Sequence, residues 1–81
     1  MSERDPGPGI PVAALLGAEI RAERARQGWT QAALAERVGV EQRTISRWET
    51  GQARIRMEDF VSVALALSVS PGTLLDAALA R

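Results

Sequence analysis

Residues 39 to 51 read GVEQRTISRWETG, and this short stretch decides how the rest of the chain folds. Its composition and glycine ends predict a helix from about Gln42 to Thr50. At 3.6 residues per turn, one side of that helix carries polar side chains that can hydrogen-bond outward, namely Gln42, Arg43 and Arg47. The opposite side carries Ile45, Trp48 and Glu49. The pattern predicts a helix held against the protein by a tryptophan, with two arginines and a glutamine presented to a partner.

A second helix is predicted directly before this one, from Gln31 to Val38, with Thr30 as its N-cap residue. Only three residues, GVE, separate the two helices, which is too short a link for antiparallel packing. It suits two helices that cross at a steep angle, as in a helix-turn-helix. Ala35 is small enough for the crossing point, and Gly39 can adopt the positive φ that the turn needs.

Helical patterns on both sides of these two helices predict a compact all-α domain of five short helices over residues 12–81. Besides the two helices above, the periodic segments are about Val12 or Ala13 to Gln27, Met57 to Leu67 and Pro71 to Ala80. Ser70 and Pro71 are typical of a helix start, as N-cap and first helical residue. Residues 1–11 hold three prolines and two glycines and are predicted to form a flexible N-terminal arm.

The composition excludes several classes of function. The 81 residues contain no Cys and no His, so we expect no disulfide, no metal site of the usual ligands and no cofactor. Ser46 has no histidine to activate it, and we expect no enzyme activity. No apolar run approaches the roughly 18–20 residues that span a membrane, and residues 1–11 do not read as a signal peptide. We therefore expect a cytoplasmic protein, associated with the nucleoid if it binds DNA.

The net charge of zero hides two unlike regions. Residues 21–56 hold eight arginines and four glutamates, hence +4. The remainder holds two arginines against six acidic residues, hence −4. A basic middle between acidic flanks is consistent with a one-sided basic face that binds an anionic partner such as DNA.

Two segments carry a family resemblance that covers about residues 15–76. They are GAEIRAERARQGWTQAALAERVGVEQRTISRWETG, residues 17–51, and ALALSVSPGTLL, residues 64–75. Together they resemble the Cro/repressor-type helix-turn-helix family, also called the xenobiotic-response-element family. The resemblance implies a five-helix, lambda-repressor-like DNA-binding domain. It also implies a transcriptional regulator that binds a palindromic double-stranded operator as a homodimer.

The resemblance assigns a role to each polar position. The base-reading residues would be Gln42, Arg43 and Arg47, in a recognition helix that lies in the major groove. Their chemistry agrees, because Gln can bond adenine and Arg can bond guanine through two hydrogen bonds each. The phosphate-binding residues would be Gln31, Thr44, Arg54 and Arg56. Gln31 also lies at a helix N-terminus, whose N–H groups and dipole favour anions.

Two charged residues are interpreted as structural. Arg24 falls on the apolar side of the first helix and Glu49 on the inner side of the third, and the resemblance implies an ion pair between them. Trp29 and Trp48 are interpreted as packing residues. The chain departs from the family pattern at Glu41, a poor helix cap, and at Ser68, which would be strained if its φ is positive.

The function predicted from the sequence is a DNA-binding transcriptional regulator, most simply a repressor. We expect homodimers, with Leu75 and Leu79 of the last helix as candidate contacts. Two alternatives stay open: an antitoxin of the same fold that binds a toxin or another regulatory protein, and a protein-interaction module with no role on DNA.

Overall fold

The computed structural model describes residues 11–81 and folds them into five α-helices, with no strand in that range. The helices are α1 (Val12–Arg26), α2 (Gln31–Val38), α3 (Gln42–Glu49), α4 (Met57–Ala66) and α5 (Pro71–Leu79). The predicted all-α class with five helices is therefore confirmed. The arm predicted for residues 1–11 lies outside the described residues except for Pro11, which is the N-cap residue of α1.

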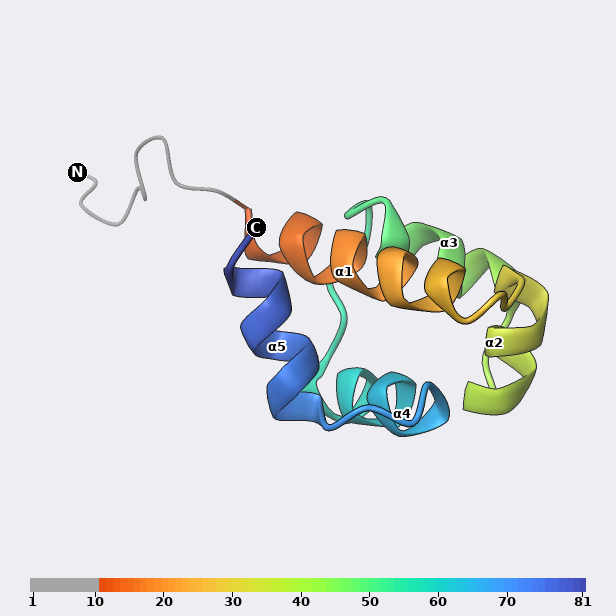
Figure 1. The fold of residues 1–81 in the computed structure, drawn as a ribbon. Coiled ribbons are helices and arrows are strands. Elements are labelled where there is room, and N and C mark those ends of the chain that lie inside the picture. The colour runs from red at the N-terminus through yellow and green to blue at the C-terminus, as the bar shows by residue number, and fades with distance from the viewer. Residues whose placement is uncertain (1–10) are drawn as a thin grey trace.

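The helices surround a single core (Figure 1). Helix α1 packs along α3 and against α5, α2 packs on α3 and α4, and α4 packs on α5. Each helix contributes at least one buried apolar side chain, and the cluster consists of Ile20, Leu34, Ala35, Ile45, Trp48, Phe60, Val63, Ala64, Leu67 and Leu74. The last helix returns to the start of the first, so that the C-terminus lies beside the beginning of α1 (Figure 1).

Local signals in the sequence set the helix ends. Thr30 caps α2, its hydroxyl accepting a hydrogen bond from the Ala33 N–H at 3.0 Å. Gly39 ends α2 with a φ of +89°. Ser68 also adopts a positive φ, +60°, where a residue other than glycine is strained. Within residues 11–81, neither Glu41 nor Ser70 makes a side-chain capping bond, although both occupy N-cap positions. The prediction of Ser70 as N-cap is thus right in position only.

One position in α1 had no sequence-based interpretation. Gly17 is buried in the middle of the helix, where a glycine is unfavourable by itself. A Cβ built on Gly17 would overlap the carbonyl oxygen of Trp48 and lie 3.0 Å from the carbonyl carbon and oxygen of Glu49. The missing side chain lets α1 approach the backbone at the end of α3. Gly17 therefore fixes how closely α3 is held to the body of the fold.

Within the described range, no single helix is long and apolar enough to cross a membrane. Helices α4 and α5 reach that length and composition only as a pair, and the pair is bent by 106°.

Candidate nucleic-acid interface

Helix α3 divides sharply into an exposed side and a buried side. The exposed side carries the three residues predicted to read bases, Gln42, Arg43 and Arg47. On the buried side, Ile45 is 0% exposed, Trp48 6% and Glu49 5%. An eight-residue helix has little stability of its own, so the buried side must hold it in place. The polar side chains on the other side are then displayed from a fixed backbone.

The turn between α2 and α3 has the geometry that the helix-turn-helix prediction requires. The N–H groups of Gly39 and Val40 both donate to the Ala35 carbonyl, at 2.8 and 3.0 Å. Ala35 itself is 3% exposed, and α2 and α3 pack directly on each other. The small side chain and the left-handed glycine thus close the turn and set the angle at which α3 leaves it.

Arg24 and Glu49 form a two-pronged ion pair between α1 and α3. Arg24 Nε donates to Glu49 Oε2 at 2.6 Å and Nη2 donates to Oε1 at 3.0 Å. The third guanidinium nitrogen, Nη1, donates to the Trp29 carbonyl at 2.7 Å. The Glu49 side chain is 1% exposed and that of Arg24 14%. Hydrogen bonding to Glu49 raises the pKa of Arg24 above its already high usual range, so Arg24 stays charged at any ordinary pH.

Gln31 extends this ion pair to the start of α3, a link that sequence reasoning missed. Its Nε2 donates to Glu49 Oε1 at 3.0 Å, while its Oε1 accepts from Gln42 Nε2 at 3.4 Å. The Gln31 side chain is half-buried. One amide N–H of Gln31 is left for a phosphate, so the predicted phosphate contact is geometrically possible. The structure adds a second role, because Gln31 orients Gln42 from the core side.

The remaining predicted phosphate ligands lie within α3 and in the loop that follows it. Thr44 is half-buried on α3 itself, and Arg54 and Arg56 are exposed in the loop after α3. Arg56 Nε lies 3.4 Å from Asp59 Oδ2 in the first turn of α4, with a side chain that is 76% exposed. This contact leaves Arg56 largely free to reach an anion. Arg54 adjoins the start of α1, beside Pro11 and Val12.

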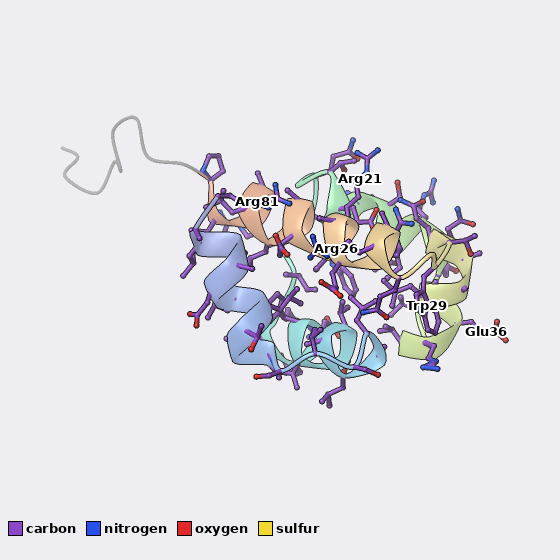
Figure 2. The ribbon with its side chains drawn as sticks, viewed as in Figure 1. Arg21, Arg26, Trp29, Glu36 and Arg81 are labelled. Carbon is purple, nitrogen blue, oxygen red and sulfur yellow. The ribbon has the colours of Figure 1, made fainter. Side chains whose placement is uncertain are left out.

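Two further sets of contacts join other parts of the fold. The Arg37 guanidinium stacks over the Trp29 ring, 4.5 Å from its centroid, and Nη1 donates to the Ala66 carbonyl at 3.5 Å. Trp29 lies next to α2, on the side where Glu36 points outward (Figure 2). The predicted packing role of Trp29 is thus accompanied by a cation–π contact.

On the other side of α1, Arg26 and Arg81 both donate to the carboxylate of Glu19, each at 3.0 Å. Glu19 is 6% exposed, and Arg81 joins the end of α5 to the middle of α1 (Figure 2). By contrast, Arg21 points away from the body of the fold. Neither the Glu19 cluster nor the stacking of Arg37 on Trp29 was expected from the sequence. Arg81 reaches Glu19 from the far end of the chain, and Trp29 precedes α2 while Arg37 lies in the last turn of that helix.

The comparisons with known proteins agree with this geometry. Residues 20–74 match the helix-turn-helix family model. The chain is 39% identical over 61 residues to repressor protein C2 of Salmonella phage P22, which covers 75% of this chain but 28% of that repressor. The chain therefore spans about a quarter of the length of that curated relative.

Two solved structures have the same fold. The clp gene regulator ClgR from Corynebacterium glutamicum superimposes with a TM-score of 0.86 at 32% identity, covering 89% of this chain and 94% of that chain. The P22 c2 repressor, solved in complex with a synthetic operator, superimposes with a TM-score of 0.69 at 37% identity, covering 76% and 94%. With its family match over most of its length, the chain belongs to the Cro/repressor-type helix-turn-helix family.

Proposed function

We propose that this protein is a sequence-specific double-stranded DNA-binding regulator of transcription, acting as a repressor on a palindromic operator. The observation that carries the proposal is the construction of α3. Its polar side is exposed, while its apolar side and Glu49 are buried and held by Arg24. A rigid helix with two arginines and a glutamine on one side suits the major groove, which is wide enough for a helix. Arginines that only keep a surface soluble would not need a helix held in place by buried side chains and an ion pair.

The base-reading residues are Gln42, Arg43 and Arg47. Gln42 stands at the start of α3, where Gln31 orients its amide. An oriented amide can bond both N6 and N7 of adenine, and each arginine can bond O6 and N7 of guanine. Arg43 and Arg47 are four residues apart and share one side of the helix. They would therefore contact neighbouring base pairs, and each half-site should contain guanine.

The phosphate-binding residues are Gln31, Thr44, Arg54 and Arg56, which flank the reading side of α3. The N-terminus of α2 adds backbone N–H groups beside Gln31. These contacts would position the protein without reading sequence. Few phosphates can be reached by one copy of so small a domain, so a homodimer on a two-fold site provides the affinity that a regulator needs. We place this activity in the cytoplasm, where bound protein would exclude polymerase.

Selection of bound duplexes from a random DNA pool tests the proposal. We expect the wild-type protein to enrich a palindrome with half-sites about one helical turn apart. The variant with Arg43→Ala and Arg47→Ala should enrich no sequence at the same moderate salt, although it folds normally. The control variant Arg21→Ala removes an exposed arginine that points away from the fold, and it should enrich the same palindrome as wild type. If the wild type enriches nothing, α3 does not read bases, and a protein partner such as a toxin becomes the target of the search.

A further inference from the structure

We infer that Glu41 is a further base-reading residue, one that selects a cytosine in each half-site of the operator. The inference rests on the proposed function, because it needs α3 to lie in the major groove. Glu41 is the N-cap residue of α3, and its side chain is exposed. It directly precedes Gln42, and in a helix-turn-helix the N-terminal residues of the recognition helix contact base edges.

The backbone of Glu41 is fixed on both sides. Val40, the residue before it, packs against the core and donates its N–H to the Ala35 carbonyl at 3.0 Å. The Glu41 carbonyl accepts hydrogen bonds from the N–H groups of Thr44 and Ile45, at 2.9 and 3.4 Å. Because Ile45 is fully buried, this end of α3 is anchored to the body of the fold. The Glu41 carboxylate is therefore presented from a defined place at the start of the helix.

The Glu41 carboxylate has no internal partner among residues 11–81. It makes no capping hydrogen bond to α3. The ion pairs within that range use other carboxylates, namely those of Glu19, Glu23, Glu49 and Asp59. The helix dipole favours a negative charge at this place, but it leaves the lone pairs of both oxygens unused. The carboxylate of Glu41 is therefore available to accept hydrogen bonds from a ligand.

An ionised carboxylate accepts hydrogen bonds and donates none, which limits the bases that Glu41 can read. Guanine and thymine present acceptors and no donor to the major groove, so they would repel it. Adenine has one donor, N6, beside the N7 acceptor, an arrangement that the Gln42 amide matches. Cytosine itself presents only the N4 amino group, which is the donor that a glutamate reads. Glu41 therefore adds a preference for cytosine to the guanine and adenine preferences of the other three reading residues.

The same carboxylate opposes binding to any duplex that offers it no donor. With α3 in the major groove, the negative charge of Glu41 comes near the phosphate backbone, and like charges repel. A duplex with cytosine at the right position offsets this repulsion through a charge-assisted hydrogen bond, whereas a duplex with thymine or guanine there does not. Glu41 thus contributes an attractive contact to the correct site and a repulsive one to the others, and both increase specificity.

Operator selection followed by affinity measurements with two charge-matched variants tests the inference. Glu41→Gln and Glu36→Gln each remove one negative charge from an exposed side chain, and Glu36 points outward from α2 (Figure 2). The wild type should enrich cytosine at one position of each half-site, beside the adenine that Gln42 reads. In Glu41→Gln, the ratio of affinities for duplexes with cytosine and with thymine at that position should fall about fivefold or more. Glu36→Gln should keep the wild-type ratio.

The outcome that overturns the inference is a uniform one. If the carboxylate only repels phosphate, Glu41→Gln will bind every duplex more tightly by the same factor, and the ratio will not change. Glu41→Ser supplies a better N-cap, so it should be at least as stable to urea as the wild type and still lose the cytosine preference. A loosened α3 is then excluded as the cause. A wild type that enriches no sequence refutes the proposed function and this inference together, whereas an operator that Glu41→Gln selects unchanged refutes the inference alone.

Discussion

Replacing Gly17 by alanine is expected to lower the free energy of unfolding by about 3 kcal/mol, the upper end of the usual cost of overpacking. The new Cβ would meet only backbone atoms, the Trp48 carbonyl oxygen and the Glu49 carbonyl group. Backbone cannot rotate aside as a side chain can, so α1 and α3 must separate. Alanine's better helix propensity returns about 1 kcal/mol, and the estimate is net of that gain. Urea unfolding followed by the fluorescence of Trp29 and Trp48 measures the change.

Gly72 provides the matched control, because it is also a helical glycine. A Cβ there would meet nothing closer than the Ser70 hydroxyl at 3.7 Å, which is an ordinary contact. Gly72→Ala should therefore leave stability unchanged or raise it by up to about 1 kcal/mol. If Gly17→Ala proves as stable as Gly72→Ala, the close approach of α1 to α3 does not exist as described.

Replacing Arg24 by methionine should cost about 3–5 kcal/mol, since it leaves a buried charge without its partner. The Glu49 side chain is 1% exposed, and Gln31 would be its one remaining side-chain partner among the described residues. The loss also frees the Trp29 carbonyl from its bond with Arg24. Arg24→Lys should recover part of the stability, because it restores the charge but not the two-pronged geometry. The same urea titration measures each variant.

An exposed ion pair serves as the control that shows whether burial causes the large stability loss expected for Arg24→Met. Arg56→Met removes a contact with Asp59 that is 3.4 Å long and made by a side chain 76% exposed. It should cost less than about 1 kcal/mol. Replacing both Arg24 and Glu49, by methionine and leucine, should recover much of the loss seen in Arg24→Met. Equal stability losses in Arg24→Met and Arg56→Met would contradict a structural role for the buried pair.

The sequence predicted those features that depend on neighbouring residues. Four helices begin at the predicted residue, and α1 begins at Val12, the first of its two predicted starts. Four of the five end one residue earlier than predicted. In each of those four, the residue predicted to be last is the C-cap, as for Gln27 and Thr50. The spacing of apolar residues also distinguished the buried side of α3 from its exposed polar side, because an α-helix has 3.6 residues per turn. The sequence also indicated that Ser68 would be strained if its φ were positive, and its φ is +60°.

The sequence could not predict contacts that depend on how the helices pack. Gly17 lies far from Trp48 in the chain, and an interior glycine was the only signal of a close approach. The Glu19 cluster includes Arg81 from the other end of the chain. Gln31 was interpreted through its place at a helix start, which says nothing of its bonds to Glu49 and Gln42. Three-dimensional packing brings these groups together, and no local pattern records it.

The most direct test of base reading by α3 is the ratio of the protein's affinity for its selected duplex to its affinity for a scrambled duplex. The selected duplex and a scrambled duplex of equal length would be titrated at two salt concentrations, with wild type, Arg43→Ala and Arg54→Ala. Arg43→Ala should lower the ratio about fivefold or more, because one bidentate pair contributes about 1–3 kcal/mol of discrimination. Arg54→Ala should weaken binding to both duplexes alike, keep the ratio and reduce the salt slope by about one. If Arg43→Ala also weakened both duplexes alike, Arg43 would contact only phosphate, and α3 would not be the helix that reads the operator.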